Sequence, residues 1–152
     1  MRQNFTFLVI LLLATISIIN ATPHQLYKRA TQFVPCNNTA NPPLLNVNIT
    51  PDPPAPGASL NIDASGTSPN AITQGATISV AFIDAKNNII GSATVEDLCS
   101  QPGILCPVAG GSPFTIPTIT TTIPPIITGT ALDISVIGPT GINTLLCAVA
   151  HF

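Results

Sequence analysis

Charged residues are scarce in this 152-residue chain, and the few that are present are unevenly distributed. Only 7 % of the chain is charged, about a quarter of the usual share. Three of the four basic residues precede residue 30, so that one lysine and six acids follow, a net charge of −5. This balance excludes the basic footprint that nucleic-acid binding needs, and it excludes adsorption to anionic lipid through a basic patch.

Side chains suited to catalysis are also few. From residue 30 onward the chain has one histidine, His151, and one lysine, Lys86, whereas a nucleophile needs a base to activate it. Glu96 and Asp97 directly follow a predicted strand, and adjacent residues in a strand point to opposite faces, which does not suit a pair of catalytic carboxylates. We expect no enzymatic activity, no cofactor and no bound metal.

The first 21 residues are typical of a secretory signal peptide. Arg2 precedes a mostly apolar run over residues 7–19, which is shorter than the roughly 20 residues that span a bilayer, and the small Ala21 follows. No later stretch is free enough of Pro, Asn, Thr and Gly to cross a membrane. We expect a soluble protein that is secreted, or delivered to the lumen of a vacuole or lysosome, through the secretory pathway.

A dibasic pair, Lys28-Arg29, follows in a polar stretch. Kexin-type proteases cut such sites, which predicts a pro-segment over residues 22–29; two solvated charges in a loose terminus are the alternative. The remaining domain, residues 30–152, is long enough to bury about two thirds of its unfolded surface. Asn37 and Asn48 begin Asn-x-Thr acceptors and are candidates for glycosylation, although Pro51 weakens the second.

Four cysteines, Cys36, Cys99, Cys106 and Cys147, predict two disulfides in a secreted chain, with three possible connectivities. Cys99 and Cys106 enclose six residues and suit a short loop closure, which leaves Cys36 to pair with Cys147. Metal binding is the rival interpretation, but the C-x6-C spacing is not typical of zinc and neither histidine lies near it in the sequence.

Apolar and polar residues alternate with period two after residue 43, which predicts strands. Abundant β-branched residues and 16 prolines argue against helices, and Lys86-Asn87-Asn88 is typical of a turn. About seven short strands predict an all-β protein with two antiparallel sheets packed as a sandwich. We expect these strands over residues 45–50, 60–63, 78–82, 89–95, 115–123, 132–136 and 145–150.

Three segments resemble the ML lipid-recognition family, closest to its fungal phosphatidylglycerol/phosphatidylinositol transfer proteins and the Niemann–Pick type C cholesterol carriers. They are PDPPAPGASLNIDASGT at residues 51–67, VEDLCSQPGILCPVAGG at residues 95–111, and the Ile-Pro-Pro that begins at residue 123, with Cys147 near the end. Their order and the cysteine positions are similar over nearly all of residues 34–152.

The resemblance implies an immunoglobulin-like β-sandwich whose sheets splay apart to hold one lipid, with no catalysis. It implies intermembrane transfer of one sterol or phospholipid by a monomer that contacts membranes transiently, and it supports the disulfides Cys36–Cys147 and Cys99–Cys106. The mouth of the cavity is expected near residues 99–111 and 124–129. A lipid pocket must be apolar, since each buried CH₂ contributes about 0.8 kcal/mol. The candidate lining residues are Val80, Phe82, Ile90, Val95, Phe114, Ile116, Ile119, Ile134, Val136 and Val149.

One departure from the fungal relatives concerns charge. Those relatives tend to have lysines after "CP" and after "IPP", where this chain has residues 108–111, Val-Ala-Gly-Gly, and residues 126–129, Ile-Ile-Thr-Gly. An anionic head group therefore finds no cation there, which leaves a sterol or a neutral lipid more open. The alternative function is a secreted interaction or cell-wall-associated protein with a filled core and no lipid ligand.

Overall fold

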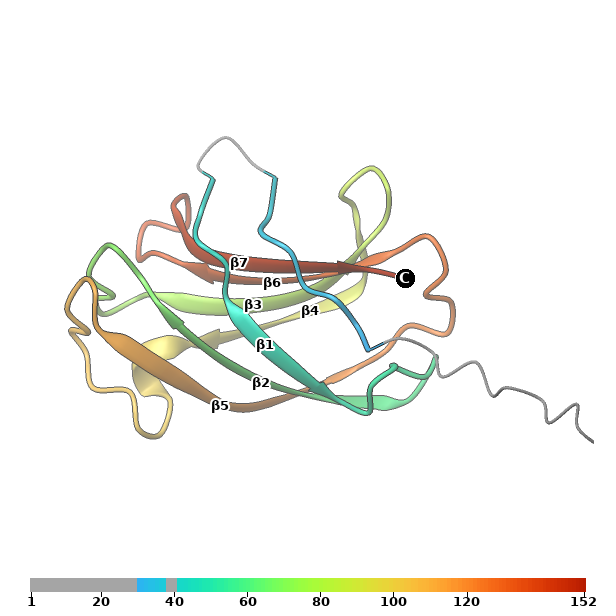
Figure 1. Cartoon of the computed structure of the whole chain (residues 1–152), viewed down its shortest axis with the longest axis horizontal. Helices are drawn as coiled ribbons and strands as arrows, with labels where there is room; N and C mark the ends of the chain where they lie inside the picture. Colours follow the sequence, from blue (N-terminus) through green and yellow to red (C-terminus); the bar gives the residue numbers. More distant parts are fainter. Residues whose placement is uncertain (1–29, 38–40) are drawn as a thin grey trace, which may run out of the picture.

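The computed structural model describes residues 30–37 and 41–152, in which two antiparallel sheets pack face to face (Figure 1). The predicted signal peptide, the dibasic pair and two residues of the first glycosylation acceptor lie outside these ranges. The three-stranded sheet has the order β1-β2-β5, formed by β1 (Asn46–Thr50), β2 (Ser59–Thr67) and β5 (Pro113–Thr122). The four-stranded sheet has the order β4-β3-β6-β7, formed by β4 (Ile89–Asp97), β3 (Thr77–Ile83), β6 (Ala131–Ile137) and β7 (Thr144–His151).

The seven strands confirm the predicted all-β sandwich, and most begin and end close to their expected positions. β2 differs most, because it continues beyond Asp63 to Thr67 and pairs with the start of β5. This extension consists of small residues, so it has no alternating large apolar side chains from which a strand could be predicted. A Cβ atom at Gly66 would lie 2.7 Å from Cδ2 of Leu146 in the facing sheet, so the Leu146 side chain would have to shift to admit a larger residue there.

The β3–β4 hairpin forms the turn that the sequence predicts. The Asp84 carboxylate accepts the backbone N–H groups of Lys86 at 2.8 Å and Asn88 at 2.9 Å, and Asn87 adopts a left-handed φ of 63°. Hydrogen bonds from Asn88 and Lys86 hold the pKa of Asp84 below its ordinary value. The local turn chemistry therefore sets the pairing of β3 with β4.

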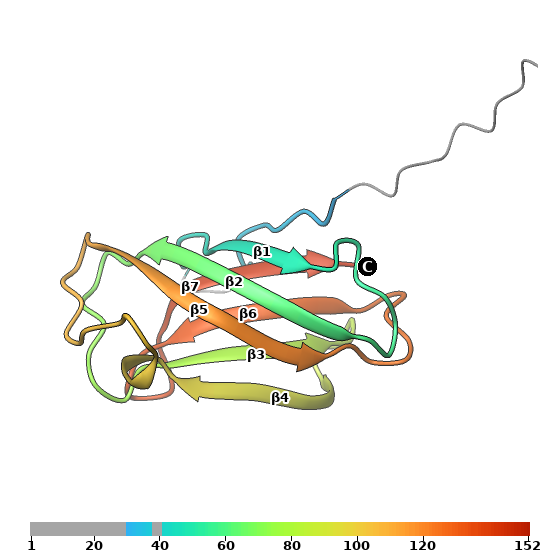
Figure 2. The ribbon, with the colours of Figure 1, turned by 90° about the horizontal axis from the view of Figure 1, so that it is seen from below.

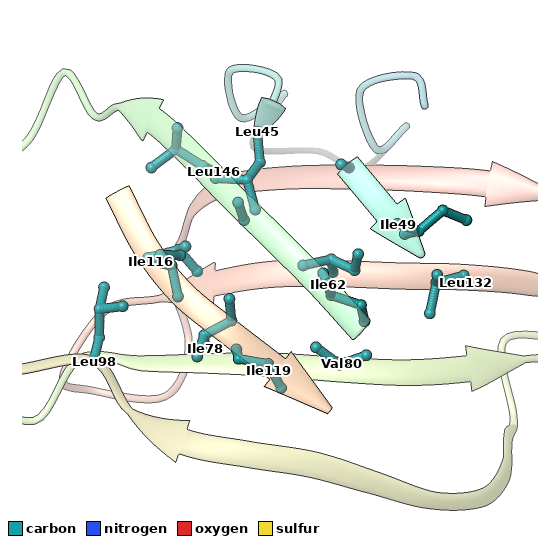
Figure 3. Close-up of a cluster of buried hydrophobic side chains, with 14 of the residues drawn as sticks. Leu45, Ile49, Ile62, Ile78, Val80, Leu98, Ile116, Ile119, Leu132 and Leu146 are labelled. Atoms are coloured by element: carbon teal, nitrogen blue, oxygen red, sulfur yellow. The ribbon is translucent and has the colours of Figure 1, made fainter. Parts of the chain in front are cut away.

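Aliphatic side chains from both sheets fill the space between them (Figure 3). Ile62, Ile116 and Ile119 of the three-stranded sheet face Ile78, Val80, Leu132 and Leu146 of the four-stranded sheet, and all are at most 2 % exposed. The two buried phenylalanines, Phe82 and Phe114, belong to the same cluster. The sandwich thus has one continuous apolar interior.

Both predicted disulfides are present, Cys36–Cys147 and Cys99–Cys106. The second closes the loop that contains the short 3-10 helix η1 (Leu98–Ser100). The first ties the segment before β1 to β7, and Val34 of this segment also exchanges two backbone hydrogen bonds of 2.9 Å with Val149 along the edge of that strand. Within the described residues, no helix is long and apolar enough to cross a membrane.

Candidate functional site

The two long edges of the sandwich are joined differently. At the β1–β7 edge the chain bridges the sheets with backbone hydrogen bonds, from Leu45 to the Cys147 carbonyl and from Cys147 to the Pro43 carbonyl, each 3.1 Å. At the opposite edge, β4 and β5 belong to different sheets (Figure 2). There the Thr94 hydroxyl donates to the Thr121 hydroxyl over 3.2 Å. One edge is therefore held by the backbone, and the other carries a side-chain contact.

A groove with a volume of about 400 Å³ follows the β4–β5 edge. Side-chain hydroxyl groups and apolar side chains line it, and none of its lining residues is charged. Its floor continues into the core, because Ile123 is 1 % exposed and Thr94 and Ile90 lie opposite Val80 and Phe82 in the β3–β4 register. The lining consists of residues 90–92, Thr94 and residues 120–125.

The structure brings eight of the ten predicted lining residues to the interior or its edge. Ile90 is half-buried in the wall of the groove. The other seven belong to the buried cluster between the sheets: Val80, Phe82, Phe114, Ile116, Ile119, Ile134 and Val136. These residues define the apolar face that a ligand between the sheets would contact.

The expectation that Val95 lines the interior is wrong. Val95 is 59 % exposed and pairs with Ser79 on the outer face of the four-stranded sheet. Ile90 and Thr94 face inward on the same strand, opposite Phe82 and Val80. Val95 is an odd number of residues from both, so strict alternation along β4 places it on the outer face.

The expectation for Val149 is also wrong. Val149 lies opposite Asp133 in the β6–β7 register, on the face that carries Cys147 and Ser135, whereas Ala148 and Ala150 face the core. Val149 is half-buried, and Val34 pairs with it in an antiparallel bridge along the free edge of β7. Val149 does not belong to the cluster between the sheets.

The expected mouth combines two loops that the structure separates. Residues 99–111 precede β5 and residues 124–129 follow it, so the length of this ten-residue strand lies between them. Of these residues, Pro124 and Pro125 line the groove. A single mouth formed by both loops is therefore wrong, and sequence reasoning missed the hydroxyl-bearing residues of the edge itself. The run Thr120-Thr121-Thr122 before Ile-Pro-Pro was their only signal.

A second polar cluster lies on the outer face, beneath the segment before β1. The Ser135 hydroxyl donates to the Asp133 carboxylate over 2.6 Å, and the other carboxylate oxygen lies 3.7 Å and 3.8 Å from Sγ of Cys36 and Cys147. These cysteine and aspartate side chains have the types and proximity of metal ligands, but both sulfurs are committed to a disulfide. Burial raises the pKa of Asp133, and the Ser135 hydrogen bond opposes that shift.

Asp133→Asn is expected to raise the melting temperature by a few degrees at neutral pH. The folded protein holds the Asp133 proton more tightly than the unfolded chain, so stability falls as the pH rises from about 3.9 through the raised pKa. Asn carries no such penalty, and its advantage should shrink below that window. Denaturation between pH 3 and 8 checks this, with Asp84→Asn as a control whose pKa shift has the opposite sign. An advantage that is constant with pH would contradict the prediction.

The comparisons with known proteins identify the class. A family model described as the ML domain matches residues 30–150, and the chain belongs to that family, whose members are non-catalytic lipid-binding proteins. No curated protein matches the chain. Among solved structures, the chain is similar to chicken MD-1 complexed with lipid IVa, with a TM-score of 0.49 and 14 % identity over 79 % of this chain and 88 % of that one. The two disulfides, together with this family, are typical of extracellular or luminal proteins.

Proposed function

We propose that this protein binds one lipid between its two sheets and that the lipid enters at the β4–β5 edge. The observation that carries the proposal is the difference between the two edges. The β1–β7 edge is held by backbone hydrogen bonds and a disulfide, whereas the β4–β5 edge has a groove above the apolar interior. Membership of the ML-domain family supports the class of ligand.

Opening of this edge requires few polar contacts to break. The Thr94–Thr121 hydrogen bond contributes about 1 kcal/mol, as hydrogen bonds that exchange with water usually do. Burying an acyl chain or a sterol ring system contributes about 0.8 kcal/mol for each CH₂, which offsets this loss and the rearrangement of the packed side chains. The sheets pivot about the β1–β7 edge and the ligand takes the place of side-chain contacts in the core.

The groove favours a sterol or another lipid with an uncharged head group. Ser92, Thr94 and residues 120–122 line the groove, and the Thr120 hydroxyl already donates to Asn61 over 2.9 Å. The hydroxyls of Ser92, Thr94 and Thr121 can donate to or accept from a ligand hydroxyl. In the described part of the chain the one lysine or arginine side chain is Lys86, which is exposed on the β3–β4 turn. An anionic head group would lack a cation in the groove and would meet the field of the six acids.

Transfer between membranes follows as a passive cycle of extraction, shielded transport and release. The protein acts as a secreted or luminal monomer that contacts donor and acceptor membranes transiently. No covalent step takes part, so the free energy of the lipid in the two membranes sets the direction.

Native mass spectrometry after incubation with vesicles tests this function. One sample is incubated with vesicles of phosphatidylcholine and cholesterol, and another with vesicles of phosphatidylglycerol. We expect one bound lipid per chain, and a larger lipid-bound fraction with the first vesicles than with the anionic phosphatidylglycerol. Ile90→Trp narrows the groove and should reduce occupancy several-fold, whereas Ile89→Trp, at the exposed neighbouring position, should not. Protein that stays bare with both vesicles would contradict the proposal and favour a filled sandwich with an interaction role. A preference for phosphatidylglycerol would contradict the assignment of the head group.

A further inference from the structure

The start of the described domain is held by the carboxylate of Asp52, in the loop between β1 and β2. The backbone N–H of Thr31 donates to both carboxylate oxygens, at 3.0 Å and 3.1 Å, and the Thr31 hydroxyl donates to Oδ1 at 2.7 Å. Three hydrogen bonds to a single carboxylate fix the position of Thr31. Ala30 directly precedes Thr31, so the Ala30 nitrogen is one residue away from this contact.

Other contacts fix the same segment further along. Val34 is bonded to β7 and Cys36 is covalently joined to it. A groove of about 560 Å³ is lined by residues 30–32 on one side and by Pro53 and Pro54 on another, so Ala30 lies beside the loop that carries Asp52. The segment from residue 30 to residue 36 is therefore held at both ends.

The sequence places a protease site directly before this contact. Lys28-Arg29 precedes Ala30, and the match to the ML domain begins at residue 30. We propose that cleavage after Arg29 makes Ala30 the N-terminus, and that its new α-ammonium group pairs with the Asp52 carboxylate. An endoprotease specific for dibasic sites would hydrolyse the Arg29–Ala30 peptide bond. Water supplies the hydroxyl of the new Arg29 carboxylate, and the freed amine takes up a proton.

The distances allow this pair to form without rearranging the domain. The Ala30 nitrogen is three covalent bonds from the Thr31 nitrogen, at most about 3.7 Å away, and the Thr31 nitrogen already contacts Asp52. Rotation about the bonds of Ala30 moves the ammonium group relative to the carboxylate. In the uncleaved chain the same nitrogen is a neutral amide, so a positive charge appears beside Asp52 only after cleavage.

This inference concerns maturation and is independent of whether a lipid is bound. The test compares protein secreted by a eukaryotic host with the variant Lys28→Gln/Arg29→Gln, which removes the dibasic site. Intact mass and N-terminal sequencing should place the first residue at Ala30 in the former, and the variant should keep its preceding residues. Any other N-terminus in the unaltered protein would overturn the proposal.

Asp52→Asn, made in both forms, isolates the proposed ion pair. It should lower the melting temperature by about 1–4 °C more in the cleaved form, the range expected for an exposed charge pair. Asp63→Asn, which removes an exposed carboxylate on β2 that accepts from Thr118, should have equal effects in the two forms. Equal effects of Asp52→Asn in both forms would overturn the pairing.

A second measurement needs only the cleaved protein and can be made even if the uncleaved variant is not secreted. The cleaved chain has two amines, the α-amino group of Ala30 and the side chain of Lys86, which NMR after reductive ¹³C-methylation can follow separately. Asp52 faces the α-amino group and His151 lines the same groove. The α-amino pKa should lie above its ordinary value of about 7.7–8.0 and return toward it in Asp52→Asn. An α-amino pKa that Asp52→Asn leaves unchanged would overturn the pairing.

Discussion

Oxidised protein that carries T94C and T121C is expected to take up at least about tenfold less lipid than the unaltered protein, because a covalent link across β4 and β5 removes the open state. The two hydroxyl oxygens are 3.2 Å apart, so cysteine sulfurs at these positions lie within reach of a disulfide bond of about 2.05 Å. Uptake of a fluorescent sterol from vesicles measures the effect.

Single variants provide the matched controls. T94C and T121C alone each lose one of the hydroxyls but cannot form the cross-link, so each should take up several-fold more lipid than the oxidised double variant. The cross-link joins strands at a solvent-accessible edge and leaves the core side chains in place, so the melting temperature should not fall. Full uptake by the cross-linked protein would show that a ligand enters elsewhere, and equal losses in the single variants would show that the hydroxyl groups themselves matter.

The positions of the strands follow from patterns that are local in the chain. Most strands alternate between polar and apolar residues, and the Asp84 turn fixes one hairpin. The interior positions on β3 and β6 were therefore predictable, because Val80 and Ile134 sit in regular alternation on paired central strands. The disulfides were predictable for a similar reason, since a short loop left one remaining pair.

The site was predicted less well because it depends on how two sheets meet. Val95 and Val149 are apolar, but each lies an odd number of residues from an inward-facing residue of its own strand, Ile90 and Ala148, so alternation places both on the outer face. The threonines at residues 120–122 resemble any exposed strand until β4 is placed beside them. Such relations between distant segments have no local signal in a single sequence.

The Cys36–Cys147 disulfide should contribute far more to stability than Cys99–Cys106, although both bonds are chemically alike. In the loop-entropy treatment the stabilisation grows with the length of chain enclosed, and the two separations are 111 and 7 residues. The expected contributions to the free energy of unfolding are therefore about 5 kcal/mol and about 2.5 kcal/mol. Since small domains have only about 5–15 kcal/mol in total, C36S/C147S approaches the limit of folding.

Equilibrium unfolding in guanidinium chloride should thus show a much lower midpoint for C36S/C147S than for C99S/C106S. The structure adds a second cause to the entropic one. The Cys36–Cys147 bond anchors the segment before β1 onto the edge where the backbone bridges the sheets, so its loss also weakens the proposed pivot. In the folded fraction of C36S/C147S, the amide hydrogens of Leu45 and Val149 should therefore exchange faster than in the unaltered protein. The amide hydrogen of Ile134, in the centre of the sheet, should exchange only through global unfolding, as it does in the unaltered protein. Equal midpoints for the two double variants would show that the long closure does not constrain the unfolded chain. Unchanged hydrogen exchange at Leu45 would show that the β1–β7 edge holds without the disulfide.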